Sequence, residues 1–254
     1  MAPALSGATA HVPSGAAARA EPGGDGAVMV DLAHTPVRDL NHRLHRLTAQ
    51  SNERSWRVLN AAGKHALAVG LSQPVDVVVV GHTGYYCGGM NQAATITIEG
   101  HAGPGVAENM MSGLVRVRGN ASAAAGASGR GGLLVIEGDA ASRCGISMKG
   151  IDIVVGGSVG HMAAFLGQAG RLVVCGDAGD DLGDSIYEAA LYVRGKVGRL
   201  GADCIEKPMT PAHAAQLGAL LKQAEFDHDP ALFRRFGSAR KLYHYHVDNA
   251  DAYA

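Results

Sequence analysis

Alternating apolar residues recur along the middle of the chain at a fixed interval. Seven short runs each carry an aliphatic residue two and four positions before a closing glycine. Every step between these glycines is 19 residues, without insertion. Such alternation, rich in β-branched residues, is typical of a strand with one buried face. The closing glycines, which we interpret as structural, are Gly81, Gly100, Gly119, Gly138, Gly157, Gly176 and Gly195.

A strand repeated at a fixed period predicts a parallel β-solenoid, in which each coil hydrogen-bonds to the next and buries its apolar columns in a shared interior. The fold class expected is therefore mainly β: a right-handed parallel β-helix of 19-residue coils over residues 75–203. At about 4.8 Å per coil, six steps span roughly 29 Å. Small residues recur three and seven positions after each closing glycine, which indicates sharp bends or close packing there.

The two flanks of the repeat predict short helical caps. Residues 1–27 are rich in Ala, Gly, Ser and Pro and read as a disordered extension. Residues 28–74 form an N-terminal cap, in which Thr35 and Pro36 are expected to start a helix and "WRVLN" and "HALAVGL" to form strands. A cap is needed because an open solenoid end exposes strand edges.

Residues 204–254 follow the repeat and predict C-terminal helices with a docking tail. Thr210 precedes Pro211, and Asp229 precedes Pro230, two signals for a helix start. The tail is "GSARKLYHYHVDNADAYA". We expect it to dock on this chain or on a partner.

Composition excludes several classes of function. The formal charge is −1, so a basic face for nucleic acid is not expected. No apolar run approaches the roughly 18 residues that span a bilayer, so no membrane partner is expected. The four cysteines are far apart and form no CxxC pair, which argues against a zinc or iron–sulfur site and favours reduced thiols in the cytoplasm. Cys87 and Cys144 share an inner column three coils apart and are interpreted as inert core fillers.

Ten residues outside the repeat pattern are candidates for an interface or a channel wall. Tyr85 and Tyr86 lie at the first coil, where we expect them to pack against a partner chain or the N-terminal cap. The arginine and lysine among the ten have the chemistry to hold a phosphate or carboxylate, although a polar outer wall is the favoured reading. The ten are Tyr85, Tyr86, Glu108, Asn109, Arg143, Ser147, Lys149, Tyr243, His244 and His246.

Neither of two possible metal sites is expected to bind a metal. His244 and His246 would share one face of a strand, but no third ligand has a fixed place. An acidic cluster follows Gly176, but its spacing matches no calcium-binding loop. The cluster comprises Asp177, Asp180, Asp181 and Asp184.

No catalytic motif accompanies the repeat. The sequence contains no G-x-S-x-G, P-loop, HExxH or Rossmann fingerprint. We therefore expect no catalytic residue and no cofactor-binding residue in this chain.

Longer motifs resemble a known family over residues 30–254. The evenly spaced glycines are similar to the GXGXG domain, the right-handed parallel β-helix that closes the large subunit of glutamate synthase. The resemblance is closer to the stand-alone GXGXG subunit of N-methylglutamate synthase and its glutamate-synthase-like paralogues. It is carried by "GYYCGGMNQAAT", "GPGVAENMMSG", "GRGGLLVIEGDAASRCGISMKGIDIVV", "GDSIYEAALYVRG", "LGADCIEKPM" and "GSARKLYHYHVDNADAY".

The resemblance implies a hetero-oligomer that makes N-methylglutamate and ammonia from methylamine and glutamate. One partner would be a glutamine-amidotransferase-like subunit, and another an FMN- and iron–sulfur-containing glutamate-synthase-like subunit. This chain would be the non-catalytic scaffold, and it has none of the cofactors itself. The family assigns no catalytic residue to this subunit.

Two alternatives remain open beside this reading. The same scaffold could serve a glutamate-synthase-like, glutamine-dependent complex, because substrates would touch other chains. A free β-helix that acts on polysaccharide is disfavoured, since aromatics make up only 5% of the chain and we see no Asn or Asp column along the coils.

Overall fold

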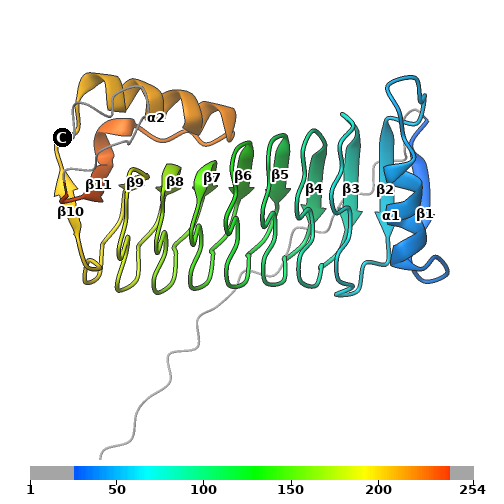
Figure 1. Cartoon of the computed structure of the whole chain (residues 1–254), viewed down its shortest axis with the longest axis horizontal. Helices are drawn as coiled ribbons and strands as arrows, with labels where there is room; N and C mark the ends of the chain where they lie inside the picture. The colour runs from blue at the N-terminus through cyan, green and yellow to red at the C-terminus, as the bar shows by residue number, and fades with distance from the viewer. Residues whose placement is uncertain (1–25, 241–254) are drawn as a thin grey trace, which may run out of the picture.

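The computed structural model describes residues 26–240, which form one sheet of 11 strands in the order β1 through β9, then β11, then β10. Pairing is parallel from β1 to β9, so the chain winds as a β-solenoid (Figure 1). This confirms the mainly β, parallel solenoid fold. The strands are β1 (Val28–Asp31), β2 (Ser55–Leu59), β3 (Asp76–Val80), β4 (Thr95–Glu99), β5 (Leu114–Val117), β6 (Leu133–Ile136), β7 (Lys149–Val155), β8 (Ala169–Val174), β9 (Ala190–Val193), β10 (Cys204–Lys207) and β11 (Arg234–Ser238).

The strands stack in the register that the sequence repeat predicts. Val79 lies opposite Ile98, and Ile98 lies opposite Val117, so each step is 19 residues. A second row of parallel bridges repeats the same interval from Thr83 to Val197 on another side of the coil. The inner columns are fully buried and form one continuous core along the solenoid.

The closing glycines are needed because adjacent coils approach closely. A Cβ on Gly100 would lie 2.6 Å from the carbonyl oxygen of Gly81, and one on Gly195 would lie 2.4 Å from that of Gly176. Gly81 differs: its φ of +100° is the reason for a glycine there, and its Cβ would meet nothing. The column is therefore structural, as interpreted, and close backbone approach is the main reason.

The third side of each coil bends through residues in the left-handed region. These lie five, seven and nine positions after the closing glycine; in one coil they are Arg143 (φ 60°), Gly145 (φ 71°) and Ser147 (φ 53°). Glycine or alanine takes the middle position, which accounts for the small residues found there in the sequence. We call this side the bend wall.

The parallel ladder continues into the N-terminal cap. β1 pairs with β2 and β2 with β3, and helix α1 (Val37–His45) buries Leu40 and Leu44 against the same core. Helix α1 begins after Pro36, which is itself the N-cap, so the expected Thr35 cap is wrong. "WRVLN" is a strand as predicted, but "HALAVGL" is not: its alternating left-handed residues make it the first pass of the bend wall.

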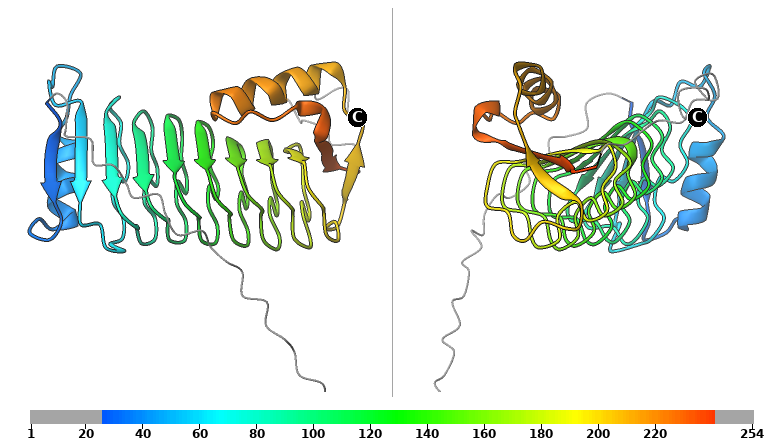
Figure 2. Two further views of the ribbon diagram at one scale, coloured as in Figure 1. Left: turned by 180° about the vertical axis from the view of Figure 1, so that it is seen from behind. Right: turned by 60° about the vertical axis from the view of Figure 1, so that its left-hand side comes forward.

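The C-terminal segment folds back onto the solenoid. Helix α2 (Pro211–Gln223) runs along the outer face of the sheet toward its middle, and the chain then returns through the 3-10 helix η1 (Pro230–Leu232) (Figures 1 and 2). β11 enters antiparallel between β9 and β10. Thr210 caps α2, because its side chain accepts the backbone N–H of His213, as the sequence predicted.

Helix α2 creates a second core on the outside of the sheet. The outward column of β6 to β9 is buried beneath Leu217, Leu220 and Leu221 of the helix. In the sequence this column looked mixed, because its first members are not covered. The covered members are Val135, Val154, Val173 and Tyr192.

Candidate functional site

A ladder of polar side chains joins successive coils beside the closing glycines. Each member accepts a hydrogen bond from the backbone N–H of the residue 19 positions later, at 2.7 to 3.0 Å. The first two members, His82 and His101, also stack their imidazoles 4.8 Å apart. These groups hold the solenoid together and are not free for chemistry. The ladder comprises His82, His101, Asn120, Asp139, Ser158 and Asp177.

The ladder is a mixed polar column and not a column of Asn or Asp, and sequence reasoning did not recognise it. Its members differ in residue type but share one property: each presents an acceptor atom one or two bonds beyond Cβ. That property was the signal available in the sequence. Because the backbone N–H of His101 donates to Nδ1 of His82, the Nδ1 atom of His82 must carry no proton.

The candidates at the first two coils lie together on the bend wall. Tyr85 is 52% exposed, its ring lies 4.3 Å from that of His65, and its backbone N–H donates to Nδ1 of that histidine. Tyr86 has a φ of 63° and lays its ring over the space that a Cβ on Gly89 would fill. Asn109 Nδ2 donates to the Tyr86 hydroxyl at 3.5 Å. The N-terminal segment thus supplies a contact to one tyrosine, and the other packs within the repeat.

Glu108 belongs to the same group. Its Oε2 would lie 2.7 Å from a Cβ on Gly105, so the carboxylate folds back over its own coil. Glu108 and Asn109 are half-buried, and Pro104 beside them is exposed. The group therefore forms a mixed aromatic and polar surface on the first coils.

Arg143, Ser147 and Lys149 lie three coils further along and do not meet the tyrosines. Arg143 occupies the same column as Tyr86, so about 14 Å of solenoid separates them. Arg143 and Lys149 are exposed, and within residues 26–240 no hydrogen bond or ion pair engages their side chains. Tyr243, His244 and His246 lie outside the described residues.

The acidic cluster makes separate contacts between coils. Asp181 binds the guanidinium of Arg199 through two hydrogen bonds of 2.9 and 3.1 Å, and Asp180 accepts the Arg199 backbone N–H. Asp184 accepts the backbone N–H of Ala202 in the next coil at 3.2 Å. Over the part of the chain that the structure describes, no three His, Cys, Asp or Glu residues are grouped to hold a metal ion.

All four cysteines are buried free thiols. Burial raises the pKa of Cys87 and Cys144 to about 12. It also raises the pKa of Cys175 and Cys204 to about 11. Since the thiolate is the reactive form, these side chains are inert near neutral pH, which confirms the core-filler interpretation of Cys87 and Cys144.

Sequence reasoning missed Arg116, which joins the sheet to the end of helix α2. Its side chain is 6% exposed, and its guanidinium pairs with Glu137 at 3.2 Å and donates to the carbonyl of Ala224 at 3.3 Å. A cation suits this place because the end of a helix carries partial negative charge. The sequence did contain a signal for Arg116: it is the one charged residue in the outward column from Val78 to Tyr192.

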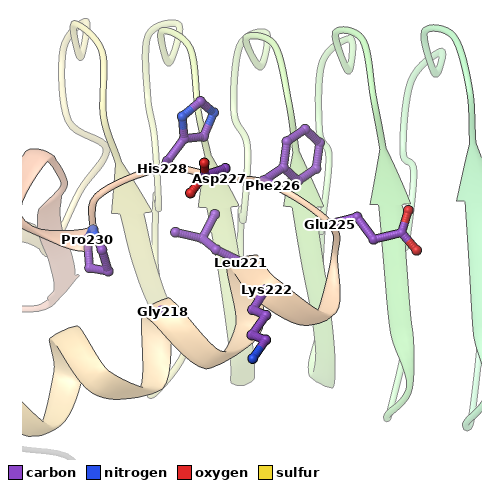
Figure 3. A pocket seen from close by; sticks show the side chains of 8 residues that line it. All are labelled: Gly218, Leu221, Lys222, Glu225, Phe226, Asp227, His228 and Pro230. Carbon is purple, nitrogen blue, oxygen red and sulfur yellow. The ribbon is translucent and has the colours of Figure 1, made fainter.

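A shallow hollow lies between the end of α2 and the segment that returns toward β11 (Figure 3). His228 lies here, with Nδ1 3.0 Å from the guanidinium of Arg194. Desolvation and the Arg194 charge lower the pKa of His228, so its imidazole is neutral at pH 7. The lining residues are Gly218, Leu221, Lys222, Glu225, Phe226, Asp227, His228 and Pro230.

Neither helix within residues 26–240 is long and apolar enough to cross a bilayer. No protein-family model matches the chain. No solved structure matches it. The chain is 62% identical over 226 residues to Protein GlxC of Rhizobium meliloti (strain 1021). The match covers 89% of this chain and 99% of that protein. The chain therefore belongs to the family of Protein GlxC.

Proposed function

We propose that this chain is a non-catalytic scaffold subunit of a multi-subunit N-methylglutamate synthase complex in the cytoplasm. The complex would convert methylamine and glutamate to N-methylglutamate and ammonia, that is, act as a methylamine–glutamate N-methyltransferase. The motif resemblance supports this role, and the kinship with Protein GlxC is consistent with it. The chain would hold a glutamine-amidotransferase-like subunit and an FMN-containing glutamate-synthase-like subunit in register.

The observation that carries the proposal is how the polar side chains of the solenoid are used. The ladder from His82 to Asp177, the carboxylates around Arg199 and the buried Arg116 all make contacts between coils or between layers. A stack of coils fixed in this way resists bending and presents long faces to other proteins.

FMN and the iron–sulfur cluster belong, in this proposal, to the partner subunit. An iron–sulfur cluster takes several cysteine thiolates around one centre. Here Cys87 and Cys144 are three coils, or about 14 Å, apart, and burial raises the pKa of both thiols. The cysteines of this chain therefore do not fit such a cluster.

The surface around Tyr85 is our candidate for docking a partner. An exposed tyrosine beside Glu108 and Asn109 offers both apolar area and hydrogen bonds, a combination enriched at protein interfaces. Replacing Tyr85 and Tyr86 together by alanine should weaken assembly and leave the solenoid folded, since Tyr85 is half exposed. Pull-down of the partner subunits with normal yield by this double variant would contradict the assignment.

The scaffold role is tested by co-expression of the complex with and without this chain. We expect the two partner subunits to separate in gel filtration, and N-methylglutamate formation to fall at least tenfold, when the chain is omitted. A complex that assembles and works without it would refute the proposal. An assay with glutamine, 2-oxoglutarate and a two-electron donor in place of methylamine and glutamate tests the alternative, a glutamate-synthase-like complex.

A further inference from the structure

A second hollow lies at the C-terminal end of the solenoid, where β11 enters the sheet. Its wall on one side is the segment that leads into β9, with Tyr187 and Glu188. Its other side and floor come from β10, β11 and the residues just after β11. Three of its lining side chains are cations: Lys207, Arg235 and Arg240.

Two of these cations face each other across the antiparallel pair of β10 and β11. Lys207 lies directly opposite Arg235 in the register. Like charges in directly opposed positions destabilise a strand pair. The arrangement therefore favours a negative group between or beside them.

The cationic side chains around the hollow outnumber the carboxylates. Asp203 pairs with Arg240 at 2.5 Å, and Glu188 is the one carboxylate in the lining. Three positive side chains thus stand against two carboxylates. Arg235 donates to the carbonyl of Pro208 at 3.5 Å through Nη1 and interacts with the Tyr192 hydroxyl. Its Nε is buried without a hydrogen-bond partner within residues 26–240.

The floor of the hollow is open because it is made by a glycine. A Cβ on Gly237 would lie 3.6 Å from Cδ of Lys207 and 3.8 Å from the carbonyl oxygen of Ala189, in ordinary contact with both. A larger side chain would project into the hollow. The Tyr187 side chain at the rim is 50% exposed and offers a hydroxyl donor.

We propose that this hollow binds a small oxyanion, a phosphate or carboxylate group, between Lys207, Arg235 and Arg240. Guanidinium groups hold such anions through paired N–H donors, and a lysine ammonium adds a compact charge. The bound anion would satisfy Arg235 Nε and offset the repulsion between Lys207 and Arg235. Nothing in the scaffold proposal requires this site, so each can fail without the other.

The test is a calorimetric titration of the full chain with inorganic phosphate at constant ionic strength. We expect saturable binding, weakened by about tenfold or more in Lys207→Gln, because a charged hydrogen bond is lost. Lys222→Gln, which removes an exposed lysine from α2, is the matched control and should bind as the parent does. Equal affinity in the parent and Lys207→Gln, or no saturable binding in the parent, would overturn the site.

Gly237→Val is a second variant that fills the hollow without a change of charge. A site defined by this hollow loses phosphate affinity in this variant, whereas diffuse attraction to a basic surface does not. Unchanged affinity in a folded Gly237→Val protein, checked by circular dichroism, would also overturn the proposal. Titration with acetate in place of phosphate compares the two oxyanion classes.

The anion has two possible sources, a free ion or a carboxylate of the chain itself. Asp248 and Asp251 follow the described residues in the sequence. If they supply the group, the full-length double variant Asp248→Asn, Asp251→Asn binds phosphate more tightly than the parent. If a free anion is the ligand, its affinity is unchanged. In both cases Lys207→Gln must still weaken binding.

Discussion

The outer face of the sheet differs between its two halves. Over β6 to β9 the outward residues, such as Val154 and Val173, are fully buried beneath α2. Helix α2 does not extend over β3 and β4 (Figure 1). There the same column holds Val78 and Thr97, which stay half-buried. The repeat thus sets which residues point outward, and a non-repeating helix decides which of them become core.

Arg116 marks the border between the halves. It occupies the outward column on β5, and its guanidinium binds the carbonyl at the end of α2. On the uncovered side, the pairing groups are exposed, as with Arg57 and Glu99 at 2.9 Å. The predictions below test this border, from the largest expected effect to the smallest.

A charge placed in the outward column should separate the halves most clearly. Val154→Asp buries a carboxylate between α2 and the sheet, and we expect it to lower the free energy of unfolding by about 3–5 kcal/mol. Val78→Asp, in the same column beside Arg57, should cost less than about 1 kcal/mol. Urea denaturation followed by circular dichroism measures both. Similar losses would mean that α2 does not seal the covered half.

Removal of Arg116 should cost more than removal of its neighbour Arg118. Both pair with Oε1 of Glu137, but their side chains are 6% and 50% exposed. Arg116→Ala leaves the buried carbonyl of Ala224 without its donor and removes a buried side chain from beneath the end of α2, so we expect a loss of about 3 kcal/mol. Arg118→Ala should cost at most about 1 kcal/mol. Equal melting temperatures for the two variants would contradict the border role of Arg116.

The polar ladder should contribute equally in both halves. His101→Ala and Asp139→Ala each remove one acceptor for a backbone N–H, and we expect each to cost about 1 kcal/mol in thermal unfolding. His101→Asn restores an acceptor and should recover most of that loss. A marked difference between His101→Ala and Asp139→Ala would show that the ladder depends on α2.

The thiols should show the smallest effect at neutral pH. Their pKa values, raised by burial to about 11 or 12, leave almost no thiolate at pH 8, so we expect none of the four to react quickly with a thiol reagent. After unfolding, all four should react. Rapid labelling of the native chain would show that one of the two cores is open.

The raised thiol pKa values also set a direction for stability against pH. The native state keeps these protons to higher pH than the unfolded state, whose thiols ionise at their ordinary pKa of 9.0. Their contribution is complete below pH 9 and is lost as pH rises toward 12. Unfolding midpoints measured between pH 8 and pH 10.5 should therefore fall, and midpoints that rise would contradict this.

Much of the interior could be predicted from the sequence because its contacts repeat. Cys87 is an example: its column position alone predicted a buried side chain, and it is fully buried. The ladder escaped prediction because its members share an acceptor atom and not a residue type. "HALAVGL" was read as a strand because its alternation is also produced by the bend wall, where every second residue is left-handed.

By itself, the sequence determined the 19-residue coil, the parallel register and the buried columns, because each of these depends on the same neighbours in every coil. Only the tertiary structure decided what happens once the repeat ends. The insertion of β11 between β9 and β10, the cover provided by α2 and the meeting of Lys207 with Arg235 join segments that no period relates. Such contacts are made once, so their placement depends on how the returning chain packs and leaves no periodic trace in the sequence.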